Sequence, residues 1–225
     1  MSVAQNLLSI KSELPQGVVL VAISKTHPPE TIMQAYNAGQ RIFGENKVQE
    51  MISKYEAMPK DIQWHLVGHL QTNKVKYIAP FVQLIHSVDS LKLLKEIDKG
   101  AARNNRVIDC LLQMHIAEED TKFGLSHDEL KELLLSGSLK QLQNVRIVGL
   151  MGMATFTDDL NHVRREFKGL ANIFNKVKEE FFSQDSYFNT LSMGMSGDYQ
   201  IAIEEGATMI RVGSNIFGVR NYGGN

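Results

Sequence analysis

The strongest constraint on the fold is an alternation of strand and helix patterns that repeats eight times along the 225 residues. The repeat recurs every 25 to 30 residues or so, roughly the size of one strand–helix unit, and no change in composition marks a linker between units. The predicted strands cover residues 18–23, 41–44, 64–67, 82–88, 107–116, 145–151, 190–193 and 209–212. Eight such units are typical of a (β/α)8 TIM-type barrel. Because apolar residues also recur at helical spacing over residues 3–14, we predict one α/β barrel domain over residues 1–225 with an additional N-terminal helix.

Composition and charge exclude several classes of protein. The formal net charge is −1, so the sequence predicts no nucleic-acid partner and no binding to an anionic membrane. No apolar run is long enough to span a bilayer, and no glycine-rich dinucleotide fingerprint follows a predicted strand. Cys110 is the single cysteine and lies within an apolar strand, which favours a reducing cytoplasm. The seven histidines show no metal-ligand spacing, so we expect no metal site.

Lys25 follows the most apolar strand of the chain. The run Val18–Ile23 predicts a strand buried on both faces, and the pair Pro28 and Pro29 can then open a helix. A lysine at the end of such a strand has its stem in the apolar interior and its amine at the mouth of a cleft. Desolvation lowers a lysine pKa and makes the amine a better nucleophile toward a carbonyl. The alternative is an ordinary solvated lysine at the end of a strand.

Two loops rich in small residues follow the seventh and eighth predicted strands, Ser192–Gly197 and Gly213–Asn215. Barrels often bind phosphate with the loops that follow these two strands, although each loop alone is also typical of a glycine turn with a helix cap. Arg211 lies within the apolar eighth strand, so it either closes a structural ion pair or meets a ligand.

A lysine, two phosphate loops and a strand arginine together describe a pocket for pyridoxal 5′-phosphate. The lysine would hold the aldehyde, the loops the phosphate, and the arginine the ring nitrogen. An arginine can only donate hydrogen bonds, so it would keep that nitrogen unprotonated and the cofactor a weak electron sink. His65 lies in mid-strand and is either a core histidine or a ligand, and the methionines near strand ends, among them Met193, either floor a flat ring or pack in the core.

These residues belong to an ordered series of motifs, namely Ala22–Thr26, Phe43–Asn46, Val48–Glu50, Trp64–His65, Gly68–Gln71, His86–Ser90, Gly149–Met151, Leu191–Ser196 and Arg211–Ser214. With them the sequence closely resembles the pyridoxal phosphate homeostasis protein family, which is alanine racemase-like, over essentially the whole chain. The resemblance implies a fold-type III barrel that holds pyridoxal 5′-phosphate as a Schiff base on Lys25. It implies a role in vitamin B6 homeostasis without established catalytic turnover.

The same resemblance implies the other contacts of the cofactor. Ser196, Gly213 and Ser214 would contact the phosphate, Arg211 would face the pyridine nitrogen, and Asn46 and Met193 would line the ring. Enzymes that lack their pyridoxal phosphate are the expected recipients, if any. The chain departs from the family in the loop 115–124, where His115 and Phe123 replace the usual residues, and at Lys47.

A fold-type III amino-acid racemase is the alternative function. Such racemases add a C-terminal β-domain and need a base on each face of the substrate α-carbon. Lys25 could supply one base, whereas Tyr199 and Tyr222 are more typical of packing or surface residues. We expect no additional domain and a monomer. A third possibility is a barrel that serves as an interaction module and binds no chromophore.

Overall fold

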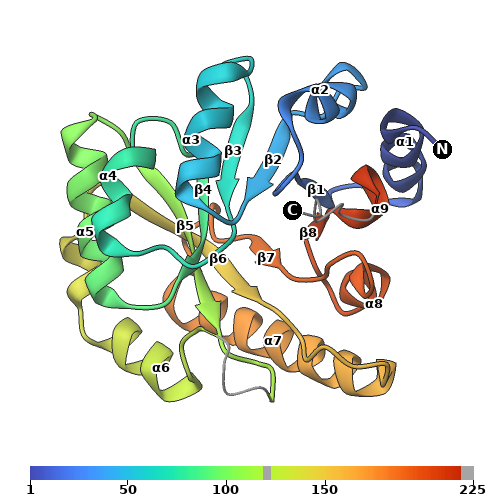
Figure 1. The fold of residues 1–225 in the computed structure, drawn as a ribbon. Coiled ribbons are helices and arrows are strands. Elements are labelled where there is room, and N and C mark those ends of the chain that lie inside the picture. The colour runs from blue at the N-terminus through green and yellow to red at the C-terminus, as the bar shows by residue number, and fades with distance from the viewer. Residues whose placement is uncertain (119–122, 219–225) are drawn as a thin grey trace.

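The computed structural model describes residues 1–118 and 123–218 and contains a closed barrel of eight parallel strands in chain order (Figure 1). The strands are β1 (Val19–Ile23), β2 (Ile42–Glu45), β3 (Gln63–Leu66), β4 (Leu84–Val88), β5 (Ile108–Met114), β6 (Val145–Gly152), β7 (Thr190–Ser192) and β8 (Met209–Val212). The predicted (β/α)8 barrel is therefore confirmed. Tyr222 and residues 119–122 of the departing loop lie outside the described residues.

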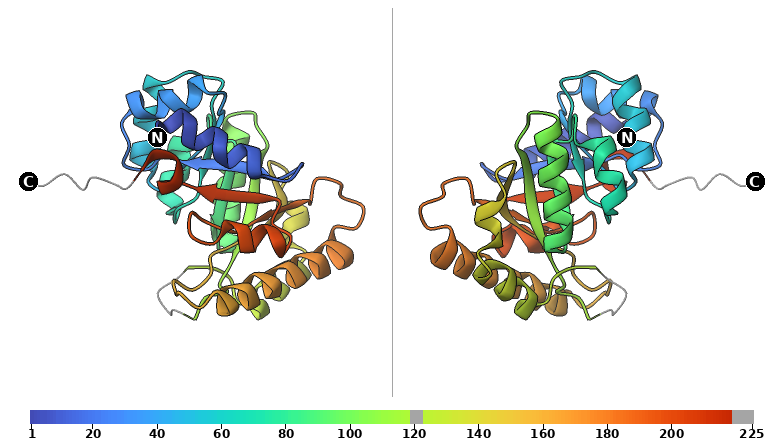
Figure 2. Two further views of the ribbon diagram at one scale, coloured as in Figure 1. Left: turned by 90° about the vertical axis from the view of Figure 1, so that its right-hand side faces the viewer. Right: turned by 90° about the vertical axis from the view of Figure 1, so that its left-hand side faces the viewer.

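Helices surround the barrel and one helix precedes it, as predicted (Figure 1). They are α1 (Val3–Glu13), α2 (Pro29–Asn37), α3 (Val48–Ala57), α4 (Val75–Ile78), α5 (Leu91–Arg103), α6 (His127–Leu135), α7 (Leu160–Phe181), α8 (Tyr199–Glu204) and α9 (Ser214–Phe217), with 3₁₀ turns at Thr72–Lys74 and Ser138–Gln141. The leading helix α1 lies beside α9, where the Asn6 amide donates to the Ile216 carbonyl at 3.1 Å (Figure 2).

The alternation of side chains along each strand builds two apolar layers. Inside the barrel a compact cluster contains Val21, Leu84 and Leu111, whereas the larger cluster between strands and helices contains Phe43 and Trp64. Both faces of the strands are thus apolar, which explains why their sequences are nearly continuous hydrophobic runs.

Short-range signals in the sequence set the helix starts. Ser126 accepts from the Glu129 amide at 3.2 Å, and the Glu129 carboxylate accepts from the Ser126 amide at 2.8 Å, so the predicted capping box is confirmed. The Ser90 hydroxyl caps α5 in the predicted way by accepting from Leu93.

Several predicted strand boundaries were wrong by a few residues. The fifth predicted strand covered residues 107–116, yet β5 extends only from Ile108 to Met114. Val82 was placed in β4, yet its amide donates to the Ile78 carbonyl and closes the preceding helical turn. Hydrogen bonds to residues outside the strand, which hydrophobicity does not report, decide these ends.

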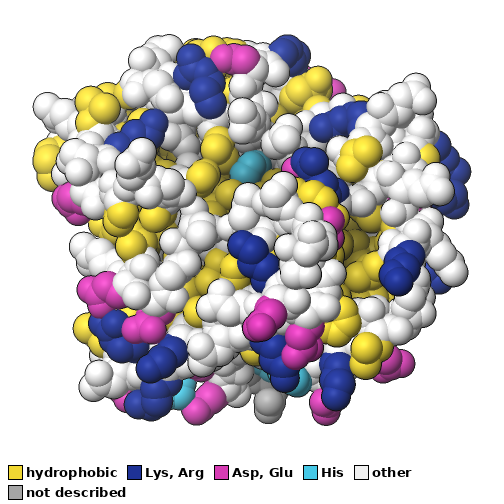
Figure 3. All heavy atoms as spheres, turned by 180° about the vertical axis from the view of Figure 1, so that it is seen from behind, with side chains coloured by type: hydrophobic (Ala, Val, Ile, Leu, Met, Phe, Trp, Pro, Cys, Tyr) yellow, Lys and Arg dark blue, Asp and Glu magenta, His cyan; other side chains and the backbone are white. Residues whose placement is uncertain are grey.

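No described helix has the length and apolar character needed to cross a membrane. On the face opposite that of Figure 1, basic and acidic side chains are interspersed rather than gathered into a field of one sign (Figure 3).

The contact between β6 and β7 depends on a glycine. The pairing of β5 with β6 shifts register after Cys110, and Gly149 follows this irregularity and pairs with Thr190. A Cβ atom at Gly149 would lie 1.7 Å from the Thr190 carbonyl oxygen. Because the obstacle is backbone, no side-chain rotation can relieve it.

We therefore expect Gly149→Ala to lower the free energy of unfolding by roughly 3 kcal/mol or more, the range of severe core substitutions. Urea unfolding of purified protein measures this loss. The matched control is Gly169→Ala on the exposed side of α7, where a Cβ meets nothing within 4 Å. That control should retain stability or gain up to ~1 kcal/mol from helix propensity. Equal stability of Gly149→Ala and wild type would contradict the close approach of the Gly149 backbone to the Thr190 carbonyl.

Candidate functional site

The seven predicted site residues come from four strands that are consecutive around the barrel. They are Met193 and Ser196 after β7, Arg211 in β8 with Gly213 and Ser214 behind it, Lys25 after β1, and Asn46 after β2. Strand β1 pairs with both β2 and β8, and β8 also pairs with β7. All these residues therefore lie on one side of the rim formed by the carboxyl ends of the strands.

The loops after β7 and β8 are bonded to each other through Ser196. Its hydroxyl oxygen accepts from the Gly213 amide at 3.1 Å, and its carbonyl accepts from the Asn215 side chain at 2.9 Å. The first bond uses a lone pair of the Ser196 hydroxyl and leaves its proton for an acceptor. Ser214 next to it is exposed. The two loops thus present hydroxyl donors at one place, which fits an anionic group such as a phosphate.

Small residues allow these loops to approach the neighbouring elements. Gly194 after β7 has a φ of +91°, and a Cβ there would lie 2.6 Å from the Ala202 Cβ atom. Gly213 lies so close to β1 that its Cβ would be 3.1 Å from the Ile23 carbonyl oxygen. The loop after β8 therefore borders the turn that carries Lys25.

Arg211 is a buried cation inside the barrel, with only 4 % of its surface exposed. Its guanidinium donates to the Ser192 hydroxyl at 2.7 Å and to the Gly152 carbonyl at 2.9 Å. Burial lowers its pKa to about 10, against a weaker opposing effect of Asp198, so it remains charged at neutral pH. The ion pairs found among the described residues do not include Arg211. Among residues 1–118 and 123–218, Arg211 thus closes no ion pair, which favours the second alternative, that its remaining donors meet a ligand.

A chain of hydrogen bonds extends from Arg211 to the middle of the barrel. The Ser192 hydroxyl lies 3.0 Å from His86 Nδ1, and His86 Nε2 lies 3.0 Å from His65 Nδ1. Because Ser192 accepts from Arg211, its single proton donates to His86, and His86 Nε2 in turn donates to His65. His65 is thus a hydrogen-bonded core histidine.

Both histidines are neutral in the folded protein. Burial lowers the pKa of His65 to about 3. Burial lowers the pKa of His86 well below its usual value, helped by repulsion from His65 and Arg211. Because both histidines are neutral, the chain of hydrogen bonds that ends at Arg211 adds no second buried positive charge beside the guanidinium.

A buried ionic cluster that was not predicted lies beside the turn of Lys25. Lys54 on α3 bonds to Glu45 at the end of β2 and to Glu50 on the same helix, each at 2.7 Å. The sequence did contain a signal, because Lys54 follows Val48 and Met51 at helical spacing on the buried face of α3. A charged residue on such a face needs a partner.

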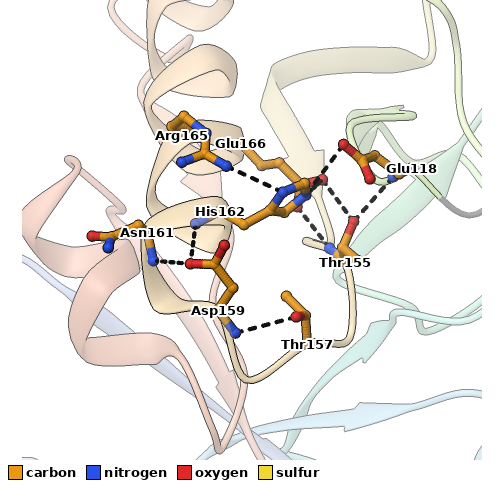
Figure 4. Close-up of polar contacts among 8 residues, drawn as sticks. All are labelled: Glu118, Thr155, Thr157, Asp159, Asn161, His162, Arg165 and Glu166. Carbon is orange, nitrogen blue, oxygen red and sulfur yellow. Dashed lines mark hydrogen bonds and ion pairs between the residues drawn. The ribbon is translucent and has the colours of Figure 1, made fainter.

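A second polar cluster joins the loops after β5 and β6 to the start of α7 (Figure 4). Thr155 donates to the Glu166 carboxylate through both its amide and its hydroxyl, each at 2.7 Å. The Glu118 amide donates to the Thr155 hydroxyl at 3.0 Å, and His162 Nε2 lies 3.0 Å from Glu166. This cluster orders the part of the rim opposite β1 and was not predicted.

The structure explains one of the unusual residues in the loop 115–124. The Phe123 ring stacks on the His69 ring beyond β3, with centroids 4.1 Å apart and planes at 19°. His69 Nδ1 is in turn 3.5 Å from the Asp89 carboxylate after β4. An aromatic residue at position 123 therefore connects the loops after β3 and β5.

In the described ranges, no cluster of three histidine, cysteine or acidic residues could hold a metal ion.

Comparison with known proteins gives a consistent result. The family model described as "Alanine racemase, N-terminal domain" matches residues 1–221. A protein of Aquifex aeolicus named "Pyridoxal phosphate homeostasis protein" is 43 % identical over 204 residues, which cover 90 % of this chain and 87 % of the relative. The solved structure of PipY from Synechococcus elongatus with PLP bound is 38 % identical, with a TM-score of 0.87, 96 % of this chain covered and 100 % of PipY.

Alanine racemase from E. faecalis shares the fold alone. Its solved structure is 16 % identical, with a TM-score of 0.74, and the match covers 97 % of this chain and 58 % of the racemase.

The neutral histidine pair predicts a loss of stability in acid. The unfolded chain takes up protons on His65 and His86 below their ordinary pKa of about 6.5, whereas the folded chain does not. Their contribution to stability is therefore complete above that pH and is lost as the pH falls toward the folded pKa of His65, about 3.

We expect His65→Asn, which cannot take up that proton, to reduce the slope of unfolding free energy against pH by up to ~1.4 kcal/mol per pH unit between pH 6 and 4. Denaturant unfolding at a series of pH values measures the slope. His127→Asn at the exposed start of α6 is the matched control for the loss of one imidazole. An unchanged slope in His65→Asn would mean that His65 is charged in the folded protein.

Proposed function

Because the chain belongs to the pyridoxal phosphate homeostasis proteins, within the alanine racemase N-terminal domain family, we propose that it binds pyridoxal 5′-phosphate and acts in vitamin B6 homeostasis. The observation that carries the proposal is the buried Arg211, which is charged and forms no ion pair with a carboxylate in the part of the chain that the structure describes. The bonded loops after β7 and β8 lie beside it. The donors of Arg211 and of these two loops are suited to bind an aromatic nitrogen and a phosphate.

Each predicted residue has a role in this proposal. Lys25 would hold the aldehyde carbon of the cofactor through its amine. Ser196, Gly213 and Ser214 would bind the phosphate, and Asn46 and Met193 would line the ring. Arg211 would donate to the ring nitrogen and, having no proton acceptor, would keep that nitrogen unprotonated. The cofactor itself would supply a carbonyl group that an amine can bind covalently.

Binding without turnover fits the described residues better than racemisation. A racemase needs a second base on the face of the α-carbon opposite the lysine. Tyr199 is buried at the start of α8, and its pKa is raised by burial, by the negative charge of Glu13 and by the hydrogen bond that its hydroxyl donates to Glu13. Tyr199 thus faces α1 and acts in packing. Curated relatives carry the homeostasis name, which also favours a binding protein.

We also propose a domain organisation, an oligomeric state, a location and a class of partners for this protein. Residues 1–225 would form one domain that works as a monomer in the cytoplasm and passes pyridoxal phosphate to enzymes that lack it. The formal net charge of −1 supports a small-molecule ligand rather than nucleic acid.

The test is an absorbance spectrum of purified wild type and Lys25→Ala after incubation with pyridoxal phosphate, with and without borohydride. Wild type should show a visible band, and borohydride should fix the cofactor on the peptide that contains Lys25. Lys25→Ala should show no such band, because its side chain has no amine. Lys47→Ala is the matched control, an exposed lysine beside Asn46, and should behave as wild type.

Two outcomes would contradict this function. A wild type that stays colourless with pyridoxal phosphate would leave a barrel that binds some other ligand or serves as an interaction module. Sustained interconversion of L- and D-alanine by the loaded protein, absent from Lys25→Ala, would instead support the racemase alternative.

A further inference from the structure

Three charged side chains meet directly behind the turn that carries Lys25. Lys54 on α3 is the centre of this cluster, and its side chain is only 5 % exposed. Its ammonium donates to Glu45 Oε1 and to Glu50 Oε1, each at 2.7 Å, and to the Ser24 carbonyl at 2.8 Å. An ammonium has three donors, so all of them are used. One of the three fixes the residue that immediately precedes Lys25.

The residue that follows Lys25 is held by the same cluster. The Thr26 amide donates to Glu50 Oε1 at 2.5 Å. Thr26 has a φ of +68°, which a β-branched residue rarely adopts. Such a conformation persists only where its surroundings enforce it, and the bond to Glu50 does so.

Glu45 completes the attachment from the side of β2. Its Oε1 atom accepts from the Ser24 hydroxyl at 2.6 Å as well as from Lys54. Besides the backbone bond from the Ser24 amide to the Gly44 carbonyl, side chains therefore tie the turn after β1 to α3 and to β2. These bonds reach the backbone on both sides of Lys25, at Ser24 and at Thr26.

The cluster has a composition that packing alone does not require. It places two carboxylates around one ammonium, with the Glu45 side chain fully buried. Among the described residues, Glu45 Oε2 has no hydrogen-bond partner. Burial raises the pKa of Glu45 to about 7, because it outweighs the attraction of Lys54 and the bond from Ser24, and Glu50 adds repulsion. An apolar contact between α3 and the barrel would avoid this cost, which argues for a role beyond attachment of the helix.

We propose that Lys54, Glu45 and Glu50 are positioning residues that hold the backbone on both sides of Lys25 and thereby fix its amine against the bound cofactor. This inference rests on the proposed binding of pyridoxal phosphate. The cluster touches the flanking residues Ser24 and Thr26, so it acts through the turn. A loosened turn lets the amine leave its position and the cofactor dissociate faster.

Glu50 offers the sharpest test, because it is the least buried member of the cluster and its replacement leaves Lys54 paired with Glu45. Glu50→Ala removes the acceptor of the Thr26 amide, whereas Glu50→Gln keeps an oxygen at the same place. Glu56→Ala is the matched control, an exposed glutamate on the same helix.

Two measurements separate positioning from a structural role. The rate of hydrogen exchange at the Thr26 amide in cofactor-free protein measures how often the turn opens. The rate of pyridoxal phosphate release from loaded protein measures how firmly the cofactor is held. We expect Glu50→Ala to accelerate both about tenfold, the effect of one lost hydrogen bond to a charged group. Glu50→Gln should restore both to within about twofold, since the amide oxygen still accepts. Glu56→Ala should leave both unchanged.

The contrary results are distinct. Faster exchange at Thr26 with an unchanged release rate would show that the cluster only supports the fold. Unchanged exchange in Glu50→Ala would show that Glu50 does not hold the turn. Either result overturns the positioning inference while the proposed function stands. A wild type that takes up no pyridoxal phosphate overturns both.

Discussion

Parallel pairing of β1 with both β2 and β8 closes the barrel, and the candidate site depends on this closure. All eight strands run in the same direction, so their carboxyl ends form one rim. Residues from the first strand–helix unit, such as Ile23, thereby become neighbours of residues from the last, such as Gly213. An open sheet with the same strands would leave β1 and β8 far apart.

Two polar networks support this side of the rim from opposite faces of the barrel wall. Inside the barrel, neutral His65 and His86 support Ser192, which accepts from Arg211. Outside it, under α3, Lys54 and its two glutamates hold the turn of Lys25. Buried polar groups are costly unless they are paired, and the hydrogen bonds of a buried network fix the geometry of the groups that they join. The proposed ligand groups therefore come from a rigid rim rather than from independent loops.

The sequence predicted the architecture well, and its errors follow a physical pattern. Periodicity and capping residues located the elements, since both report local interactions. Strand ends were less accurate, and the predicted strand 107–116 extends beyond β5 at both ends. The bonds that end strands run to other elements, such as the Ser24 amide to the Gly44 carbonyl. Lys54 is a charged residue on the buried face of α3, and from this position a buried ion pair could have been predicted.

The sequence by itself determined the eight strand–helix units, the small-residue loops after β7 and β8, and the family to which the chain belongs, because these depend on local pattern and on ordered motifs. Only the tertiary structure decided what surrounds each polar group. It bonded Arg211 to Ser192, placed His65 against His86, and brought Lys54 to the residues beside Lys25. These partners are separated along the chain by up to 106 residues, as His86 and Ser192 are. Closure of the barrel, which no local pattern encodes, brings them together.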